Sequence, residues 1–445
     1  MKKYLAAPLL VALLAVPVGA QAQSDAQRIT DLEKKVLELQ KKENAKKPKG
    51  VELYSVSDKG KLAWTSADGA YSFRLVGRVQ FDGAFFSGDD NRNGNALGIR
   101  RGRLGYKAVL AKDWISELSV DFADNAVDIK DAYIGYVGIK NSTILAGQFK
   151  TPFGNEQLTS SKDIWFVERA YIDSLAPGRR LGFGYTYGAD NFSAAAALFT
   201  QEIAPDTTGL DQGWGWAARG TFAPVMKSET RAIHLGAAAI GWQPNVGVGA
   251  GSILPPPTYI MEFSARPEVS KIAKAKYLNT GDLANVDNVQ EFGFELAAVW
   301  DSFAFQSEYI TANVSRRSGS VGLSDHDFDG WYAQASYVIN GKRKYAADEG
   351  LVDKVSLGKG KGGAWEFALR YSTMDLNDLT PVDPIKGGSA KNFTVGLSYY
   401  PNNNIRLMAN WTAVDNDEYA KPKKLYGAIP GDDFNVLQFR VQYAF

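Results

Sequence analysis

The sequence predicts an all-β protein, a 16-stranded antiparallel transmembrane β-barrel preceded by a short N-terminal coiled-coil helix. Three observations predict it. The chain opens with an export signal, its segments after residue 50 alternate apolar and polar residues, and its 445 residues include 44 Gly, 23 Phe, 21 Tyr and 10 Trp. After the export signal no run of about 18 apolar residues occurs, so the chain can enter a membrane only as strands.

The first 22 residues have the pattern of a secretory signal peptide. Lys2 and Lys3 supply a positive start, Leu5 to Val18 an apolar stretch, and Ala20-Gln21-Ala22 a small-x-small cleavage site. The pattern predicts that residues 1–22 are removed and that the mature chain is exported.

Residues 23–50 are predicted to form a periplasmic helix and linker. Ile29, Leu32, Val36 and Leu39 follow one another at spacings of three, four and three, which is an a/d heptad seam. Two heptads are too few for a stable isolated helix. We therefore expect an oligomerisation stalk, with a solvated amphipathic helix as the alternative, before a linker at residues 46–50.

Residues 51–445 are predicted to form the barrel. Leu118, Val120 and Phe122, for example, alternate with polar residues, as in strands that face lipid on one side and water on the other. About 17 candidate strands follow Tyr71, but a barrel with both ends in the periplasm needs an even number. Tyr259 to Arg266 is the weakest candidate, so we place it in an external loop from Asn245 to Asn288. Sixteen strands enclose an aqueous lumen.

Composition excludes several classes of function. The 50 Lys and Arg balance 49 Asp and Glu, which leaves no basic excess for nucleic acid. The absence of cysteine excludes disulfides and thiolate zinc sites. His234 and His326 are the only histidines, and we expect His234 to be a polar group of the lumen. The sequence predicts no metal site and no cofactor.

The phase of the strands predicts which charges point inward. Arg74, Arg78, Arg101 and Arg103 lie on two adjacent strands, and clustered guanidinium groups beside water attract anions. The alternative is a ladder of opposite charges that stiffens the wall. The other predicted inward charges are Lys107, Lys150, Arg219, Arg370, Arg406 and Arg440, with Asp82, Glu117, Asp121, Asp131, Glu295, Glu308 and Glu366.

Several motifs support a family resemblance. They are Leu75 to Gln80, Arg100-Arg101, Lys112 to Trp114, Phe149 to Lys162 followed by Glu168-Arg169, Phe263 to Glu268, and Tyr443 to Phe445. In these motifs, over most of the chain after residue 50, the sequence resembles the phosphate-selective porin O and P family. The resemblance implies a homotrimer of channels among the lipid and lipopolysaccharide of a Gram-negative outer membrane. It also implies a third external loop, about Thr151 to Arg179, folded inward as the constriction.

The resemblance implies two sets of site residues. The anion pathway would comprise Arg74, Arg78, Arg100, Arg101, Arg103, Lys130, Asp131 and Lys150, and the constriction loop would contribute Glu156, Gln157, Thr159, Ser160, Ser161, Lys162 and Arg169. The sequence departs from the family at Gln157, where a lysine is usual, and at Lys130, where a wall residue is acidic. Between Glu308 and Trp331, where the family has two further lysines, it has only Arg316 and Arg317.

The predicted function is a channel for passive diffusion of small solutes, weakly anion-preferring and able to pass anions such as phosphate. It is not predicted to be an enzyme. The main alternative is a phosphate- or polyphosphate-selective porin. An outer-membrane hydrolase and a plugged structural barrel are rival classes, and single-channel conductance would separate all of them.

Overall fold

The computed structural model describes residues 30–39, 51–52, 62–91, 93–200, 212–248, 257–273, 276–360, 362–423 and 427–445. The chain divides into two compact units, Met1–Glu52 and Leu53–Phe445. The predicted signal peptide, the seam residue Ile29 and the linker at residues 46–50 lie outside the described residues. Within those residues, no helix is long and apolar enough to cross a bilayer.

The first unit contains a helix at residues 30–39 and a short strand, β1 (Val51–Glu52). This helix lies within residues 23–50, where the sequence predicts one. Leu32, Val36 and Leu39 are 62%, 51% and 62% exposed, so the seam is available for association. The coiled coil itself stays a prediction.

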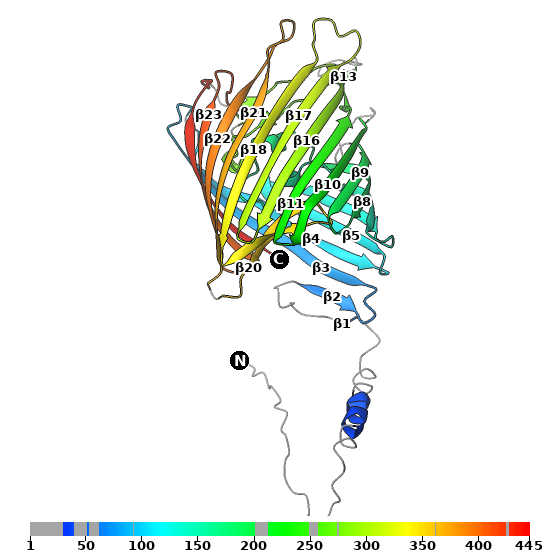
Figure 1. The fold of residues 1–445 in the computed structure, drawn as a ribbon. Helices are drawn as coiled ribbons and strands as arrows, with labels where there is room; N and C mark the ends of the chain where they lie inside the picture. The colour runs from blue at the N-terminus through cyan, green and yellow to red at the C-terminus, as the bar shows by residue number, and fades with distance from the viewer. Residues whose placement is uncertain are drawn as a thin grey trace, which may run out of the picture. The chain divides into compact units, whose positions relative to one another are not determined.

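The second unit is a closed antiparallel barrel of 16 strands, as predicted (Figure 1). The strands are β3 (Ser72–Ser87), β4 (Ala96–Leu110), β5 (Trp114–Asp121), β6 (Asp128–Tyr136), β7 (Ser142–Lys150), β8 (Arg179–Gly188), β9 (Phe192–Phe199), β10 (Gly215–Ser228), β11 (Arg231–Trp242), β16 (Val286–Trp300), β17 (Phe303–Arg316), β18 (His326–Ile339), β21 (Ala364–Asp378), β22 (Ile385–Tyr400), β23 (Ile405–Asn416) and β24 (Phe434–Ala444). β24 pairs with β3, which closes the barrel, and β2 (Ala63–Ser66) pairs with the start of β3.

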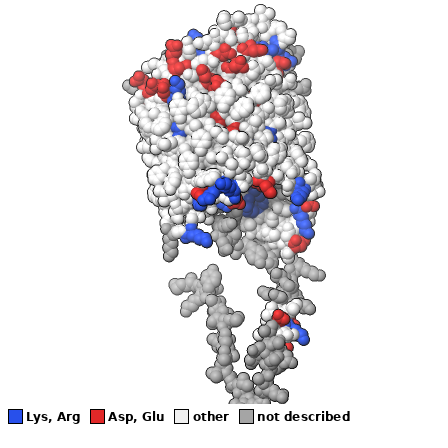
Figure 2. All heavy atoms as spheres, viewed as in Figure 1, with Lys and Arg blue, Asp and Glu red and all other residues white. Residues whose placement is uncertain are grey.

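The two faces of each strand have opposite chemistry. On β24, Phe439 and Val441 are 43% and 52% exposed on the outside, whereas Gln438 and Arg440 are buried inside. Figure 2 shows the result as a broad band with few charged residues between two charged rims. Arginine at the middle of a bilayer costs about 2–4 kcal/mol, so the barrel directs its charges into the lumen.

Most turns at the end where β3 begins and β24 finishes, the predicted periplasmic end, are short. Residues 111–113, 301–302 and 401–404 form three of them, close to the predicted positions. The turn after β18 is long and was not predicted. It carries β19 (Gly341–Ala346) and β20 (Leu351–Leu357), a pair of strands that we call the inner hairpin because its side chains bond inside the barrel.

A long loop at the opposite, external end joins β11 to β16. It contains β12 (Val246–Val248), β13 (Pro257–Tyr259), β14 (Ser264–Ala265), η3 (Lys271–Ala273) and β15 (Leu278–Asn279). The assignment of Tyr259–Arg266 to a loop is therefore correct. The loop enters the lumen, where its Glu268 carboxylate accepts hydrogen bonds from Arg370 and Ser372.

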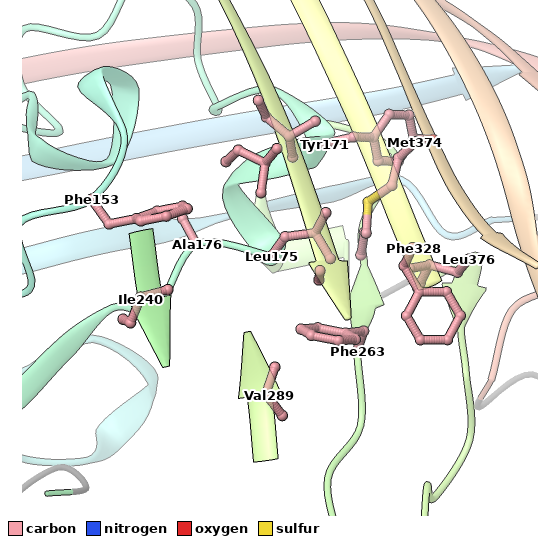
Figure 3. Packing of buried hydrophobic residues seen from close by; sticks show 14 of the residues in the cluster. Phe153, Tyr171, Leu175, Ala176, Ile240, Phe263, Val289, Phe328, Met374 and Leu376 are labelled. Carbon is pink, nitrogen blue, oxygen red and sulfur yellow. The ribbon is translucent and has the colours of Figure 1, made fainter. Parts of the chain in front are cut away.

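The constriction loop (residues 151–178), between β7 and β8, also folds inward. It contains α2 (Asn155–Leu158) and η2 (Tyr171–Ser174), and η1 (Ala123–Asn125) lies in a separate loop between β5 and β6. Figure 3 shows the apolar cluster that holds the constriction loop and the long loop against the wall. Its labelled members are Phe153, Tyr171, Leu175, Ala176, Ile240, Phe263, Val289, Phe328, Met374 and Leu376. Part of the lumen is therefore a packed core.

Candidate functional site

Wall charges hold both ends of α2 in the constriction loop. At its start, the backbone N–H groups of Asn155 and Glu156 donate to the Glu308 carboxylate at 2.7 and 2.8 Å. These N–H groups have no partner within a helix, and a carboxylate satisfies them. Glu308 therefore ties the loop to β17.

At the end of α2, two cations satisfy the backbone carbonyls. Lys150 Nζ donates to three consecutive carbonyl oxygens, those of Gln157, Leu158 and Thr159, at 2.7, 2.8 and 3.1 Å. Arg169 donates to the carbonyls of Glu156 and Thr159. The positive charges of Lys150 and Arg169 are thus engaged by the loop itself.

A third anchor is Glu168, farther along the constriction loop. Arg100 bonds it through two nitrogens at 2.7 and 3.0 Å, and Arg440 approaches to 3.0 Å. Burial alone would raise the pKa of Glu168, but these cations and Arg101 outweigh burial and lower it well below its usual value. The pKa of Glu156 behaves in the opposite way, because burial raises it to about 8 against the opposing charge of Arg370.

A cavity of about 650 Å³ remains between the constriction loop, the walls from β3 to β10 and the inner hairpin. Eleven of the described residues that line it are Lys or Arg and four are Asp or Glu. The cations are Arg74, Arg78, Arg101, Arg103, Lys107, Lys150, Lys162, Arg169, Arg179, Arg219 and Lys354, and the acids are Glu117, Asp131, Asp348 and Glu349. The lining is strongly basic although the whole chain is nearly neutral.

The acidic side chains of the wall are neutralised. Glu117 pairs with Lys107 at 2.7 Å, and Asp131 pairs with Arg179 at 2.7 Å. Arg103 similarly pairs with Asp121 at 2.8 Å, and Arg101 donates to Gln80 at 2.9 Å. The carboxylates of β5 and β6 therefore add little negative potential to the cavity.

Four lining cations have no carboxylate partner among the described residues. Arg78 donates to the Ser160 and Ser161 hydroxyls at 3.3 and 2.7 Å. Arg74, Lys162 and Lys354 form no ion pair within the described ranges. Asp348 and Glu349 of the inner hairpin also lack an ion-pair partner there, so the unpaired cations exceed the unpaired acids.

Pairs of opposite charge also stiffen the wall elsewhere in the lumen, which is the pattern of the predicted alternative. Its ion pairs are Arg219–Glu295, Arg370–Glu268, Arg440–Asp82 and the bridge of Arg343 and Arg406 to Glu366. Arg343 belongs to the inner hairpin, whose Tyr345 hydroxyl also lies 2.9 Å from His234 Nδ1. Both charge patterns thus occur within one barrel.

The structure brings together most of the predicted pathway residues, and Gln157 lines the cavity with them. Arg100, Glu156 and Thr159 lie outside the lining and anchor the loop. Lys130 does not line the cavity either. A β-bulge opposite Ser119 and Val120 leaves it unpaired in the sheet, and it bonds Asp128 instead.

Sequence reasoning missed Arg179 and Lys354. The region between Glu308 and Trp331 supplies no cavity cation, because Arg316 pairs with Asp383 at the external end. The lysine that reaches the cavity, Lys354, comes instead from the inner hairpin. The length of the turn that carries this hairpin, with apolar residues at alternating positions, is the signal that could have revealed it.

In the described parts of the chain, the hydrogen-bond partners of the two histidine side chains are acids and a tyrosine. His234 bonds Tyr345 and Glu295, as expected for a lumen residue, and His326 lies between Asp378 and Asp383 at 3.2 and 3.1 Å. Across the described residues, no group of three or more His, Cys, Asp or Glu could hold a metal ion.

Comparisons with known proteins identify similar chains. A family model described as phosphate-selective porin O and P matches residues 73–445. Porin O of Pseudomonas aeruginosa is 25% identical over 424 residues, covering 88% of this chain and 92% of the relative. The anion-selective porin from Comamonas acidovorans superposes with a TM-score of 0.51 at 13% identity, covering 84% of this chain and 100% of that one. OmpT of Vibrio cholerae, in a loop-deleted form, gives 0.51 at 12% identity, with 84% and 100% covered. These structures share the barrel fold.

Proposed function

The chain belongs to the phosphate-selective porin O and P family and is a channel of the Gram-negative outer membrane, and from that premise we propose that small anions diffuse passively through its cavity in weak preference to cations. One observation carries this proposal. Arg74, Arg78, Lys162 and Lys354 line one cavity without a carboxylate partner among the described residues, while the acids of the adjacent wall are paired.

Fixed positive charge in a narrow aqueous passage concentrates anions and excludes cations. Arg74 and Arg78 lie four residues apart on β3, which separates them by about 13 Å along the strand. An anion can therefore pass from the hydroxyl-bearing constriction at Arg78 to Arg74 near the periplasmic end by exchanging hydrogen bonds.

The preference is weak because much of the charge is already engaged. Arg100 is bonded to Glu168, and Lys150 and Arg169 are bonded to backbone carbonyls. At the position where relatives of this family have a lysine, Gln157 offers an amide. A neutral amide contributes no charge–charge attraction, and charge-assisted hydrogen bonds are about twice as strong as neutral ones.

A phosphate- or polyphosphate-selective channel is the second candidate. The Arg78 guanidinium with the Ser160 and Ser161 hydroxyls favours it, because three donors of this kind suit a tetrahedral oxyanion. Lys162 of the same loop lines the same cavity.

Planar-bilayer recording separates the two candidates. We expect the wild-type channel to show an anion-preferring reversal potential and no phosphate block of chloride current at micromolar concentration. Gln157→Lys should raise phosphate affinity about tenfold, the effect of roughly 1.4 kcal/mol from one charge-assisted bond. Gln157→Met, which removes the amide and adds no charge, is the control. Micromolar block of the wild type would instead establish the phosphate-selective candidate.

We also propose that the channel is a homotrimer whose protomers associate through the helical stalk, with lipid and lipopolysaccharide against the outer face of the barrels. Val36→Asp should weaken the trimer on native gels, because it places charge in the exposed seam. Leu37→Asp, at an exposed position outside the seam, is the matched control. Deleting residues 26–45 should weaken the trimer further and leave the barrels folded, since each barrel satisfies its own backbone hydrogen bonds. Equal trimer stability in all variants would show that the seam does not join protomers.

A further inference from the structure

The cavity has two chemically different walls. The strands β3 and β4 supply Arg74, Arg78, Arg101, Arg103 and Lys107. Strands β7, β8 and β9 supply only two charges to the same cavity, Lys150 and Arg179, and both are engaged, by loop carbonyls and by Asp131. In the described residues, the wall cations without a carboxylate partner are therefore Arg74 and Arg78 of β3, and β7 to β9 contribute none.

The part of the lining that comes from β7, β8 and β9 includes several apolar and small residues. Leu145 and Phe149 come from β7, Gly184 from β8 and Ala195 from β9. A Cβ on Gly184 would lie 2.8 Å from the Phe149 ring, so glycine lets the ring pack directly against the neighbouring strand. Leu158 of the constriction loop and Leu351 of the inner hairpin line the same cavity. We call these six residues the apolar wall.

An apolar wall gives no advantage to a hydrated inorganic ion, because the ion would lose water there without gaining a partner. A solute with an apolar body does gain, since each Å² of apolar surface removed from water is favourable. The volume of about 650 Å³ falls within the usual range for small-molecule sites, which combine apolar surface with a few placed polar groups.

We propose that the cavity binds amphiphilic organic anions, small solutes with one carboxylate, sulfonate or phosphate-ester head and an apolar body. The head bonds the Arg78 side, where the Ser160 and Ser161 hydroxyls also lie, and the body lies against the apolar wall around Leu145 and Phe149. This assignment rests on the proposed anion channel and names the class of solute that its cavity favours.

The test compares phenyl phosphate with inorganic phosphate as blockers of chloride current through the purified full-length protein in planar bilayers. The two share a head group and differ in the ring. We expect phenyl phosphate to block about tenfold more strongly, from burial of roughly 60 Å² of ring surface. Leu145→Ser should reduce that ratio toward one. Ile144→Ser, on the exposed outer face of the same strand, should retain it.

Two results would overturn the inference while the anion channel stands. One is equal block by both compounds in a channel whose reversal potential is anion-preferring. The other is a phenyl phosphate preference that survives Leu145→Ser, since the ring would then bind elsewhere. A cation-preferring reversal potential would overturn both the inference and the proposed function.

Discussion

Replacing both Arg74 and Arg78 with alanine is expected to move the channel from anion preference to cation preference. In the part of the chain that the structure describes, these arginines are two of four cavity cations without a carboxylate partner, so their loss leaves Asp348 and Glu349 opposed mainly by Lys162 and Lys354. An ion about 4 Å from a fixed charge in water interacts with it by roughly 1 kcal/mol. Two charges therefore change relative anion occupancy by about 30-fold.

Reversal potentials across a salt gradient measure this change. The experiment should use about 0.1 M salt, at which the screening length is near 10 Å, because higher salt weakens the effect. Arg231→Ala is the control, since Arg231 is half exposed at a periplasmic turn and pairs with Asp301 outside the cavity. If the double variant kept the wild-type reversal potential, the cavity would not be the conducting path.

Removing the inner hairpin is expected to increase single-channel conductance severalfold. Deleting residues 341–362 joins Asn340 to Gly363, an Asn-Gly sequence that favours a tight β-turn between β18 and β21. The barrel should stay folded, because Glu366 retains Arg406 at 3.4 Å and Glu295 retains Arg219 at 2.7 Å.

The same deletion should preserve or raise anion preference, since it removes the unpaired acids Asp348 and Glu349 together with Lys354. Lys354→Gln alone is the matched comparison. It should lower the preference without raising conductance, because the hairpin would still occupy the lumen. Conductance equal to wild type after the deletion would mean that the hairpin does not limit passage.

The barrel could be predicted because lipid and lumen impose different chemistry on alternate residues. Every strand must then alternate apolar and polar residues. A closed barrel with both ends in the periplasm also needs an even number of strands, so the sequence assigns Tyr259–Arg266 to a loop. Strand phase also placed the inward charges of β3, β10, β21 and β24 correctly, as the contacts of Arg78, Arg219, Arg370 and Arg440 show.

The prediction of inward and outward residues from strict alternation fails at β-bulges. There, one extra residue makes the residues that follow point to the opposite face of the sheet. Strict alternation from Arg101 would turn Arg100 outward, yet a bulge opposite Gln80 and Phe81 lets it reach Glu168 in the lumen. Lys130 lies at a second bulge and misses the cavity. A single extra residue leaves no mark in a pattern of alternating hydrophobicity.

The division between paired and unpaired charge could not be predicted either. Glu268, which pairs with Arg370, lies on a loop. Its place in the lumen depends on contacts with residues that are about a hundred positions away in the sequence. The inner hairpin has the same alternation as a barrel strand. Its apolar side faces other lumen residues instead of lipid, and the sequence does not distinguish these environments.

The long loop also contributes to the closure of the barrel. The Ser270 hydroxyl donates a hydrogen bond to Asp82 on β3, and the Ser270 backbone N–H donates one to Gln438 on β24. The pairing of these two strands closes the barrel. The pairing of β24 with β3 joins the most distant parts of the barrel sequence. Its entropic cost of loop closure is therefore larger than that of any other strand pair in the barrel, and its formation is slow. Because Ser270 bonds both strands, the inserted loop adds contacts that favour the closed barrel over one opened between β24 and β3.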